Sequence, residues 1–522
     1  MPPRPLFPGA EGLGVRRLTI AILACLFAVW AGVTMADSPY LVFAGFAGLL
    51  YVGTLAINAK ALAWLVIALQ PAALIVPFFP GRPFWWELCA LLAWPSLLVY
   101  FLVNRQKLSD LKFDRLERRA LIAMIGFVAV LIMLMLFRGV GFRVLGGQQM
   151  GGRFYTQQMV LAIVPLLLII ANLKERQVVG AVYLGWVMSL TYLVSDFSFS
   201  LSGGMQRILY FFEIPTDAIN FELGYEVTGL RRYQSFWYVG TAIMSAVLAW
   251  RPLYVLLGRG VWFGVPLMVG SASLALSSGH RTVFVQTVTT IVFLSIFQRY
   301  WNSARLIVAG LCLVAGLGVL YATAEYMPLS MQRAISFLPG ISVDPLSRDN
   351  AADTLNDRIE VLKLAVNDIP KYALVGRGFG MERFDVLPSD AAYSGIWQQY
   401  INGYFYNGLL GSILKTGIIG FICTGSFVFF VSKMAIDVVR MVRIKNQLEW
   451  NTFDRVCLLI CAQWFSVVLF HYCLHGDAGV WAQIFALPAA LIMYMRRDFH
   501  RKTMAATQVV PTNGEMPQRE RH

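Results

Sequence analysis

The chain has 522 residues, of which 58% are hydrophobic and only 14% are charged, and its mean hydropathy is +0.63. This composition excludes an ordinary water-soluble globular protein and indicates a polytopic membrane protein. The formal net charge of +14 does not indicate a nucleic-acid-binding protein, because the Lys and Arg residues fall mostly in short loops between apolar runs. The seven cysteines lack paired metal-ligand spacing, and we interpret them as packing residues.

Apolar runs predict an all-α polytopic integral membrane protein with about 14 transmembrane helices, since a span needs about 20 apolar residues. The runs lie at residues 18–36, 40–57, 61–80, 84–103, 120–137, 158–173, 178–195, 236–253, 261–279, 283–298, 305–323, 408–432, 455–474 and 478–495. Residues 1–323 would form an N-terminal transmembrane bundle of about 11 spans. Residues 408–500 would add the C-terminal transmembrane helices. We expect the first run to be retained rather than cleaved as a signal peptide.

The basic loops predict the orientation of these spans. Lys and Arg concentrate on one side of the count, and by the positive-inside rule this side is cytoplasmic. The loops in question are 105–119, 174–176, 299–305, 433–445 and 496–502. Both termini would therefore face the cytoplasm, with 501–522 as a disordered tail.

The two long connections, 196–235 and 324–407, then lie outside the cytoplasmic membrane. In 196–235 the sequence suggests a short interfacial helix. In 350–371 apolar residues recur at helical spacing, which predicts an amphipathic outer helix that Arg358 opens and Pro370 ends. A glycine-rich turn, Gly376 to Gly380, follows it. We expect 324–407 to be an extracytoplasmic catalytic loop.

Arginines on this outer side are candidates for binding a diphosphate. Arg281 lies between two spans with almost no loop, Arg231 and Arg232 precede another span, and Arg358 belongs to the outer helix. The planar guanidinium stays charged and matches phosphate oxygens, so several arginines at one membrane face could clamp a lipid-linked diphosphate. The alternative is that each side chain merely reaches to lipid headgroups.

Two motifs in this region resemble a known family. They are NDRIEVLKLAVNDIPKYALVGRGFG, from Asn356 to Gly380, and YNGLLGSILKTGIIG, from Tyr406 to Gly420. Together they are similar to the signature of the O-antigen ligase and O-antigen polymerase superfamily of membrane glycosyltransferases. Arg358 matches the family's outer-helix arginine, and Tyr406-Asn407 falls where a His-Asn pair is expected. His280-Arg281 is similar to a short Ser-Arg motif of many members.

The resemblance implies a glycosyltransferase on the outer face of the bacterial inner membrane. The implied donor is a glycan on a polyprenyl diphosphate, with undecaprenyl as the expected carrier, and a single displacement implies inversion. With the residues considered above, the candidate catalytic residues are Arg281, Arg358, Tyr406, Asn407 and His475. The candidate substrate-binding residues are Arg231, Arg232, His280 and Arg377. No cofactor is implied, and the lack of an acidic metal-binding cluster in the outer loops predicts metal independence.

The general base is left open by the sequence. An unperturbed tyrosine has a pKa of about 10 and is a poor base at neutral pH, so Tyr406 is a departure from the family pattern. His280, or His475 oriented by Asp477, could substitute. Alternatively, no strong base is needed, because the diphosphate leaves readily.

The acceptor also stays open. It could be another repeat unit (a polymerase, for an exopolysaccharide or O-antigen), a lipid A core (a ligase) or a protein, and we favour the polymerase. Expected partners are membrane lipid and other polysaccharide-assembly proteins, such as a chain-length regulator and a flippase. The competing functions are a lipid-linked oligosaccharide flippase, which should place charges at the membrane midplane within broken helices, and a scaffold for polysaccharide export.

Overall fold

The computed structural model describes residues 59–77, 82–103, 113–140, 151–198, 209–213, 233–300, 314–380, 395–401, 403–474, 476 and 481–508. Within these ranges the regular elements are helices, accompanied by two isolated β-bridges, Leu74 with Phe212 and Ile75 with Phe84. The predicted all-helical class is therefore confirmed for the described part of the chain. The predicted runs at 18–36 and 40–57, and the start of that at 305–323, lie outside it.

Five described helical segments are long and apolar enough to cross a membrane. They are α6 (Arg115–Arg138), α7 (Gly152–Ala171), the segment Glu175–Phe197 from α8 (Glu175–Met188) into α9 (Thr191–Ser198), α21 (Gly408–Ile444), and the segment Thr452–Leu474, which joins α22 (Thr452–Val467) to the π-helical turn η6 (Val468–Leu474). Three shorter helices, α3 (Ala59–Leu69), α14 (Val261–Leu276) and α15 (Arg281–Phe297), are also apolar. The structure thus supports a multi-span membrane protein without confirming fourteen spans.

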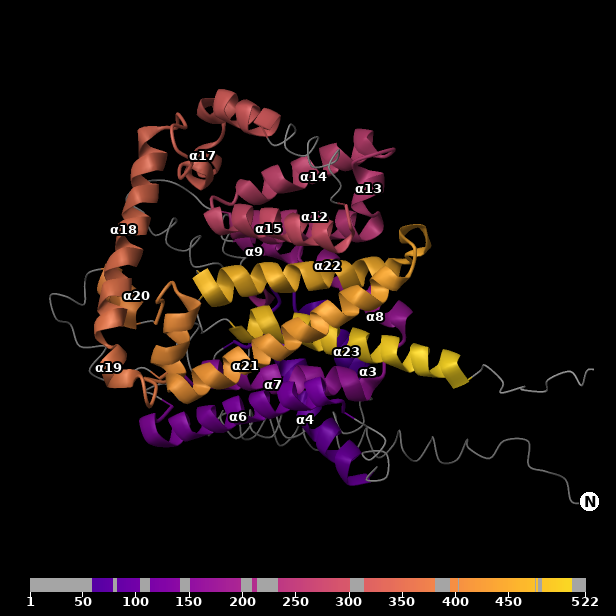
Figure 1. Ribbon diagram of the computed structural model, residues 1–522. Coiled ribbons are helices and arrows are strands. Elements are labelled where there is room, and N and C mark those ends of the chain that lie inside the picture. The colour runs from indigo at the N-terminus through magenta and orange to yellow at the C-terminus, as the bar shows by residue number, and fades with distance from the viewer. Residues whose placement is uncertain are drawn as a thin grey trace, which may run out of the picture.

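The remaining helices complete the bundle and its outer layer. In the bundle are α4 (Trp85–Val103), α12 (Gln234–Trp250), α13 (Leu253–Leu256) and α23 (Trp481–Gln508). The outer layer contains α17 (Leu329–Ile335), α18 (Pro345–Asn367), α19 (Ile369–Tyr372) and α20 (Gly395–Ile401). Short 3₁₀ turns lie at η1 (Leu209–Phe211), η2 (Ala324–Tyr326) and η5 (Gln447–Glu449). Figure 1 shows α18 running across one end of the bundle, on the side away from the last residues of α23.

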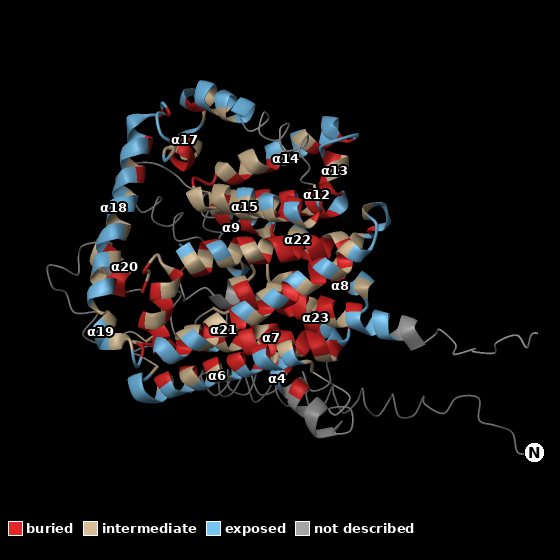
Figure 2. Cartoon of the chain, viewed as in Figure 1, coloured by how far each residue is buried: buried red, intermediate tan, exposed pale blue. Residues whose placement is uncertain are grey.

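The core lies where α7, α22 and α23 meet, and α6 covers it from outside (Figure 2). Trp464 of α22 and Tyr155 of α7 are fully buried there. On α6, by contrast, Ile125, Leu136 and Phe137 are exposed by 61%, 79% and 71%. Apolar side chains exposed along a 24-residue helix would be unfavourable in water, so this face suits the hydrocarbon of a membrane.

The end of the bundle opposite α18 is charged. Arg496 of α23 pairs with Asp114, just before α6, and with Asp437 of α21, and Lys445 pairs with Asp454 of α22 at 2.8 Å. Asp114 also caps α6, since its side chain accepts a hydrogen bond from the Glu117 N–H. The basic segments around 115, 445 and 496 thus gather at one end of the bundle, as the sequence predicted.

The outer helix differs from its prediction in both bounds. Helix α18 begins at Pro345 rather than near Arg358, because Asp344 accepts a hydrogen bond from the Leu346 N–H and Pro345 occupies the first helical position. It ends at Asn367, and Pro370 lies inside the short helix α19. The prediction that Arg358 opens the helix was therefore wrong, and Arg358 lies beyond its midpoint.

Candidate functional site

Arg281 lies where the short connection from α14 enters α15. His280 is the residue before the helix, and Gly279 adopts a left-handed φ of 76°, which favours glycine in this tight turn. The Arg281 Nη2 donates a hydrogen bond to the backbone oxygen of Ala351 on α18, at 2.5 Å. A residue of the bundle is thereby joined to the helix that crosses its end.

A second arginine, Arg333 of α17, holds the same junction and was missed by the sequence analysis. It is only 4% exposed. Its guanidinium donates to the Gly279 oxygen at 2.7 Å, to the Asn350 side chain, and to the Thr354 hydroxyl at 3.1 Å. Asn350 and Thr354 share a face of α18 at i, i+4 spacing. Arg333 therefore fixes α18 against the turn that carries Arg281.

Arg358 extends from the same helix as Ala351, to which Arg281 is bonded. The seven-residue separation corresponds to two helical turns, or about 10 Å along the axis, on one face of α18. The structure therefore brings Arg281 into contact with α18 two helical turns before Arg358, although 77 positions of sequence separate the two arginines.

The Arg358 guanidinium lies over the ring of Tyr406, 4.9 Å from its centroid. Tyr406 adopts a left-handed φ of 51°, which a bulky residue rarely does. Its hydroxyl donates to the Gln399 side chain at 2.8 Å. Tyr406 thus presents the face of its ring to Arg358, and the tyrosine in place of the expected histidine serves as a cation–π platform.

Asn407 and Arg377 have partners of their own. Asn407 caps α21, because its side-chain oxygen accepts a hydrogen bond from the Leu410 N–H at 2.9 Å. The Arg377 guanidinium lies 5.4 Å from the Tyr400 ring centroid. The Tyr400 hydroxyl donates to Asp368, and burial together with this bond raises the pKa of that phenol above its usual range.

The glycine-rich turn packs beside a break in helix α21 and hydrogen-bonds to it. Gly417 has φ 72° and ψ 177°, which interrupts the helix. Beside the break, the Arg377 N–H donates to the Leu414 oxygen at 2.7 Å and the Gly378 N–H to the Lys415 oxygen at 2.9 Å. The Ile418 N–H donates in return to the Ala373 oxygen at 2.7 Å. The turn therefore satisfies backbone groups that the broken helix leaves without helical partners.

The turn is also pinned to the core. Its Phe379 N–H donates to the buried Tyr155 hydroxyl at 3.0 Å, and the two rings meet edge-on at 5.4 Å. Lys415, only 6% exposed, places its ammonium 5.3 Å from the Phe379 ring and 5.9 Å from that of Phe405. The sequence analysis did not select Lys415, although a lysine within an apolar motif could have signalled it.

The remaining residues that the sequence analysis considered either have contacts of their own or lie outside the described residues. The His280 ring lies 5.3 Å from that of Trp237 on α12. His471 of η6 shares a hydrogen bond with Gln286 of α15 at 2.8 Å, so it is a packed, hydrogen-bonded residue. Arg231, Arg232, His475 and Asp477 lie outside the described residues.

Comparison with known proteins supports one assignment. Residues 266–425 match a family model described as O-antigen ligase. The matched region runs from α14 into α21 and contains Arg281, Arg333, Arg358, Tyr406 and the glycine-rich turn. This match confirms the resemblance drawn from the two motifs. A search of curated proteins gave no match.

Proposed function

We propose that this chain, with its O-antigen ligase region at residues 266–425, is a membrane glycosyltransferase that uses a polyprenyl-diphosphate-linked glycan. The reaction would take place at the end of the bundle where α18 lies. This end would be the outer face of the inner membrane, and the charged end with Arg496 would be cytoplasmic, with both termini. Undecaprenyl remains the expected carrier, and polymerisation the favoured outcome.

One contact carries the proposal: Arg281 bonds to the Ala351 oxygen of α18, two helical turns before Arg358. Two permanently charged guanidinium groups beside one helix would suit a diphosphate, which carries its charge on two linked phosphates. The buried bracing by Arg333 and the Tyr406 platform further suggest that the two side chains are held in place rather than directed at random headgroups.

In the proposed reaction an acceptor hydroxyl oxygen attacks the anomeric carbon of the donor sugar. The new C–O bond forms as the bond to the diphosphate oxygen breaks, and the electron pair of that bond leaves with the diphosphate. Arg281 and Arg358 would neutralise the negative charge that develops there. One displacement without a covalent enzyme intermediate would invert the anomeric configuration. Metal independence also remains a prediction.

Another group must accept the proton of the acceptor hydroxyl. Because Tyr406 presents the face of its ring to Arg358 and its hydroxyl is bonded to Gln399, we assign it a positioning role. His280, which precedes Arg281 in the chain, stays a candidate to accept the proton. His475 stays a candidate from the sequence alone.

The flippase alternative gains one argument from the structure, namely the broken helix α21 with Lys415 beside the break. Transporters use such helices at the membrane midplane. However, the part of α21 after Gly417, residues 418–444, is about 40 Å long and could cross the membrane alone. The break would then lie near the surface, next to α18, which favours a surface-active enzyme.

The proposal is tested by profiling glycans in a deletion strain that carries wild type, Arg281→Ala or Arg358→Ala. Lys363→Ala is the matched control, because Lys363 is an exposed cation on the same α18. We expect the control to restore polymer while both arginine variants leave single repeat units on their lipid carrier in the periplasm. Equal amounts of each variant in the membrane must be confirmed.

Two results would count against the proposal. Repeat units that stay on the cytoplasmic side in the deletion strain would indicate a flippase. Full rescue by both arginine variants would remove Arg281 and Arg358 from the site and would suit a scaffold.

A further inference from the structure

A cavity of about 360 Å³ lies inside the bundle, between α3, α4, α8, α12, α15, α22 and α23. Its volume falls within the range of about 300–1,000 Å³ that is usual for small-molecule sites. The cavity is distinct from the contacts between Arg281, Arg358 and α18 described above. Its lining has a chemical character of its own.

Three amide side chains contribute to this lining, Gln70, Gln286 and Gln463, from three different helical regions. The Gln463 amide donates to the Ser245 hydroxyl at 2.8 Å, and Ser245 donates to the Thr241 backbone oxygen at 2.7 Å. An amide can donate two hydrogen bonds and also accept, so this bond does not exhaust Gln463. A buried polar group is costly unless it is hydrogen-bonded, so the remaining donors and acceptors of these amides favour a polar ligand.

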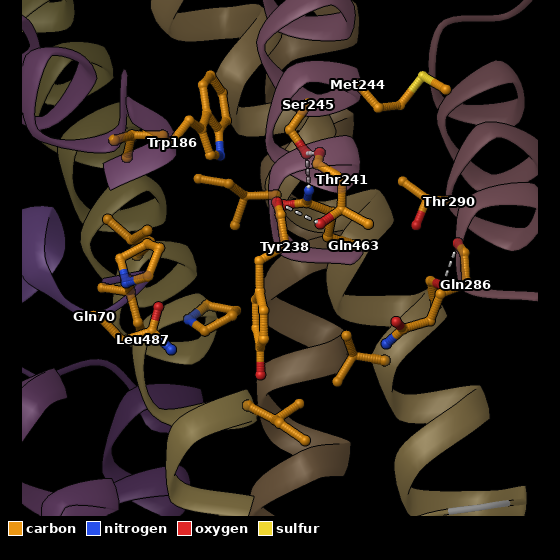
Figure 3. Close-up of a pocket in the computed structure, with 18 of the residues that line it drawn as sticks. Gln70, Trp186, Tyr238, Thr241, Met244, Ser245, Gln286, Thr290, Gln463 and Leu487 are labelled. Atoms are coloured by element: carbon orange, nitrogen blue, oxygen red, sulfur yellow. Dashed lines mark hydrogen bonds between the residues drawn. The ribbon is translucent and has the colours of Figure 1, made fainter. Parts of the chain in front are cut away.

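Aromatic rings form other walls. Trp186, Trp237 and Tyr238 all line the cavity. Figure 3 shows Tyr238 between Gln70 and Gln286, with Thr241, Ser245 and Gln463 beside its upper end. Aromatic faces next to amides and hydroxyls suit a ring that has both C–H faces and polar edges.

The charge of the lining residues limits the class of ligand that the cavity could bind. Among the described residues that line the cavity, none carries a charged side chain. A phosphate would therefore lack a counter-charge there. An isoprenoid chain would lack charge too, but it would face three amides and several hydroxyls that it cannot hydrogen-bond. A neutral molecule with hydroxyl groups needs no counter-charge and can hydrogen-bond to the amides and hydroxyls of the lining.

The cavity adjoins the arginine site. Trp237 lines it and its ring lies 5.3 Å from that of His280, the residue before Arg281. Gln286 follows Arg281 on α15 by five residues, or about 7–8 Å along the helix. A group attached directly to a diphosphate at Arg281 could therefore reach the cavity.

We infer that this cavity binds a neutral sugar ring, held by Gln286 and Gln463 and stacked on the aromatic wall. The inference rests on the proposed function, because the ring would belong to the glycan that is transferred. It adds a second binding site, within the bundle, that would select the sugar while the arginines hold the diphosphate.

The test uses purified full-length protein in detergent and follows intrinsic tryptophan fluorescence. The probes are glucose, galactose and N-acetylglucosamine as neutral sugars, and farnesol as an isoprenoid. The variants are Gln463→Leu and the milder Thr290→Val, both on the lining. Gln298→Leu is the matched control, since Gln298 is a buried amide that lies outside the cavity and accepts a hydrogen bond from the Leu253 N–H.

We expect at least one sugar to give a saturable change at millimolar concentration, while farnesol gives none. Gln463→Leu should weaken sugar binding by up to about tenfold, since it removes one neutral amide. Thr290→Val should weaken it less, and Gln298→Leu should leave it unchanged. The inference would be overturned if farnesol saturated instead of sugar, or if no sugar gave a saturable signal. It would also be overturned if both lining variants bound sugar as tightly as wild type.

The arginine variants separate this inference from the proposed function. If the sugars fail to bind while Arg281→Ala still blocks transfer, only the cavity assignment is overturned. If Arg281→Ala and Arg358→Ala transfer normally, the proposed function is overturned whatever the cavity binds.

Discussion

The guanidinium of Arg358 lies 4.9 Å from the centre of the Tyr406 ring. The two residues belong to separate motifs, 48 positions apart in the sequence, but they are in contact in the structure. Tyr406 is in turn fixed by its bond to Gln399. This relationship gives Tyr406 a role that does not require it to act as a base.

Two substitutions of Tyr406 distinguish a role of its aromatic ring from a role of its hydroxyl. Tyr406→Phe keeps the aromatic face and removes only the hydroxyl, so transfer should fall by no more than a few fold. Tyr406→Ala removes the platform, and the loss of a cation–π contact of about 0.5–2 kcal/mol should reduce kcat/KM several-fold more. The measurement is the transfer rate with purified variants. A Tyr406→Phe variant as inactive as Tyr406→Ala would show that the hydroxyl takes part in the chemistry.

Gly417 should tolerate no side chain. A Cβ there would lie 2.5 Å from the Leu374 oxygen, and φ is 72°. We expect Gly417→Ala to lower the unfolding free energy by about 1–3 kcal/mol, through strain and clash. Gly270→Ala is the control, because a Cβ at Gly270 of α14 meets nothing within 4 Å. Thermal unfolding in detergent measures both, and equal midpoints would contradict the account of the helix break.

Tyr155 should matter for the glycine-rich turn. Tyr155→Phe leaves the buried N–H of Phe379 without its acceptor, which should cost about 1–3 kcal/mol. Tyr183→Phe provides a comparison, since the Tyr183 ring packs edge-on against Trp186 at 4.9 Å and would still do so. Thermal unfolding should be lowered clearly only by Tyr155→Phe. If the two variants unfold alike, the turn is not held through Tyr155.

Glu213 should make stability depend on pH. Burial raises its pKa from 4.5 to about 7, and the nearby Glu87 acts in the same direction while Arg153 opposes it. The unfolded chain loses this proton near pH 4.5 and the folded chain only near pH 7. The contribution is therefore full below about pH 4.5 and is lost as pH rises to about 7, by at most about 3 kcal/mol.

The check is thermal unfolding of wild type and Glu213→Gln across this range. The glutamine cannot ionise, so its midpoint should fall less between pH 5 and 7 than that of wild type. Parallel curves would mean that Glu213 does not titrate in this window.

The sequence predicted the helices better than the site. Runs such as 283–298 and 455–474 lie within described helices because a membrane span needs a continuous apolar stretch, which is a local property. The start of α18 was misplaced because its signal is the capping pair Asp344-Pro345, upstream of the apolar pattern. The proximity of Arg281 to α18, the bracing by Arg333 and the pairing of Arg358 with Tyr406 all depend on tertiary packing. No spacing along the chain encodes those contacts.

The central claim is that Arg281 and Arg358 hold a diphosphate, and binding of farnesyl diphosphate to purified protein tests it most directly. Farnesol serves as the probe without phosphate, and Lys363→Ala as the control variant. Because each guanidinium would contribute charge-assisted hydrogen bonds, Arg281→Ala and Arg358→Ala should each weaken farnesyl diphosphate binding by about tenfold or more. The control should bind like wild type. Equal affinity of wild type and both arginine variants for farnesyl diphosphate would contradict the account.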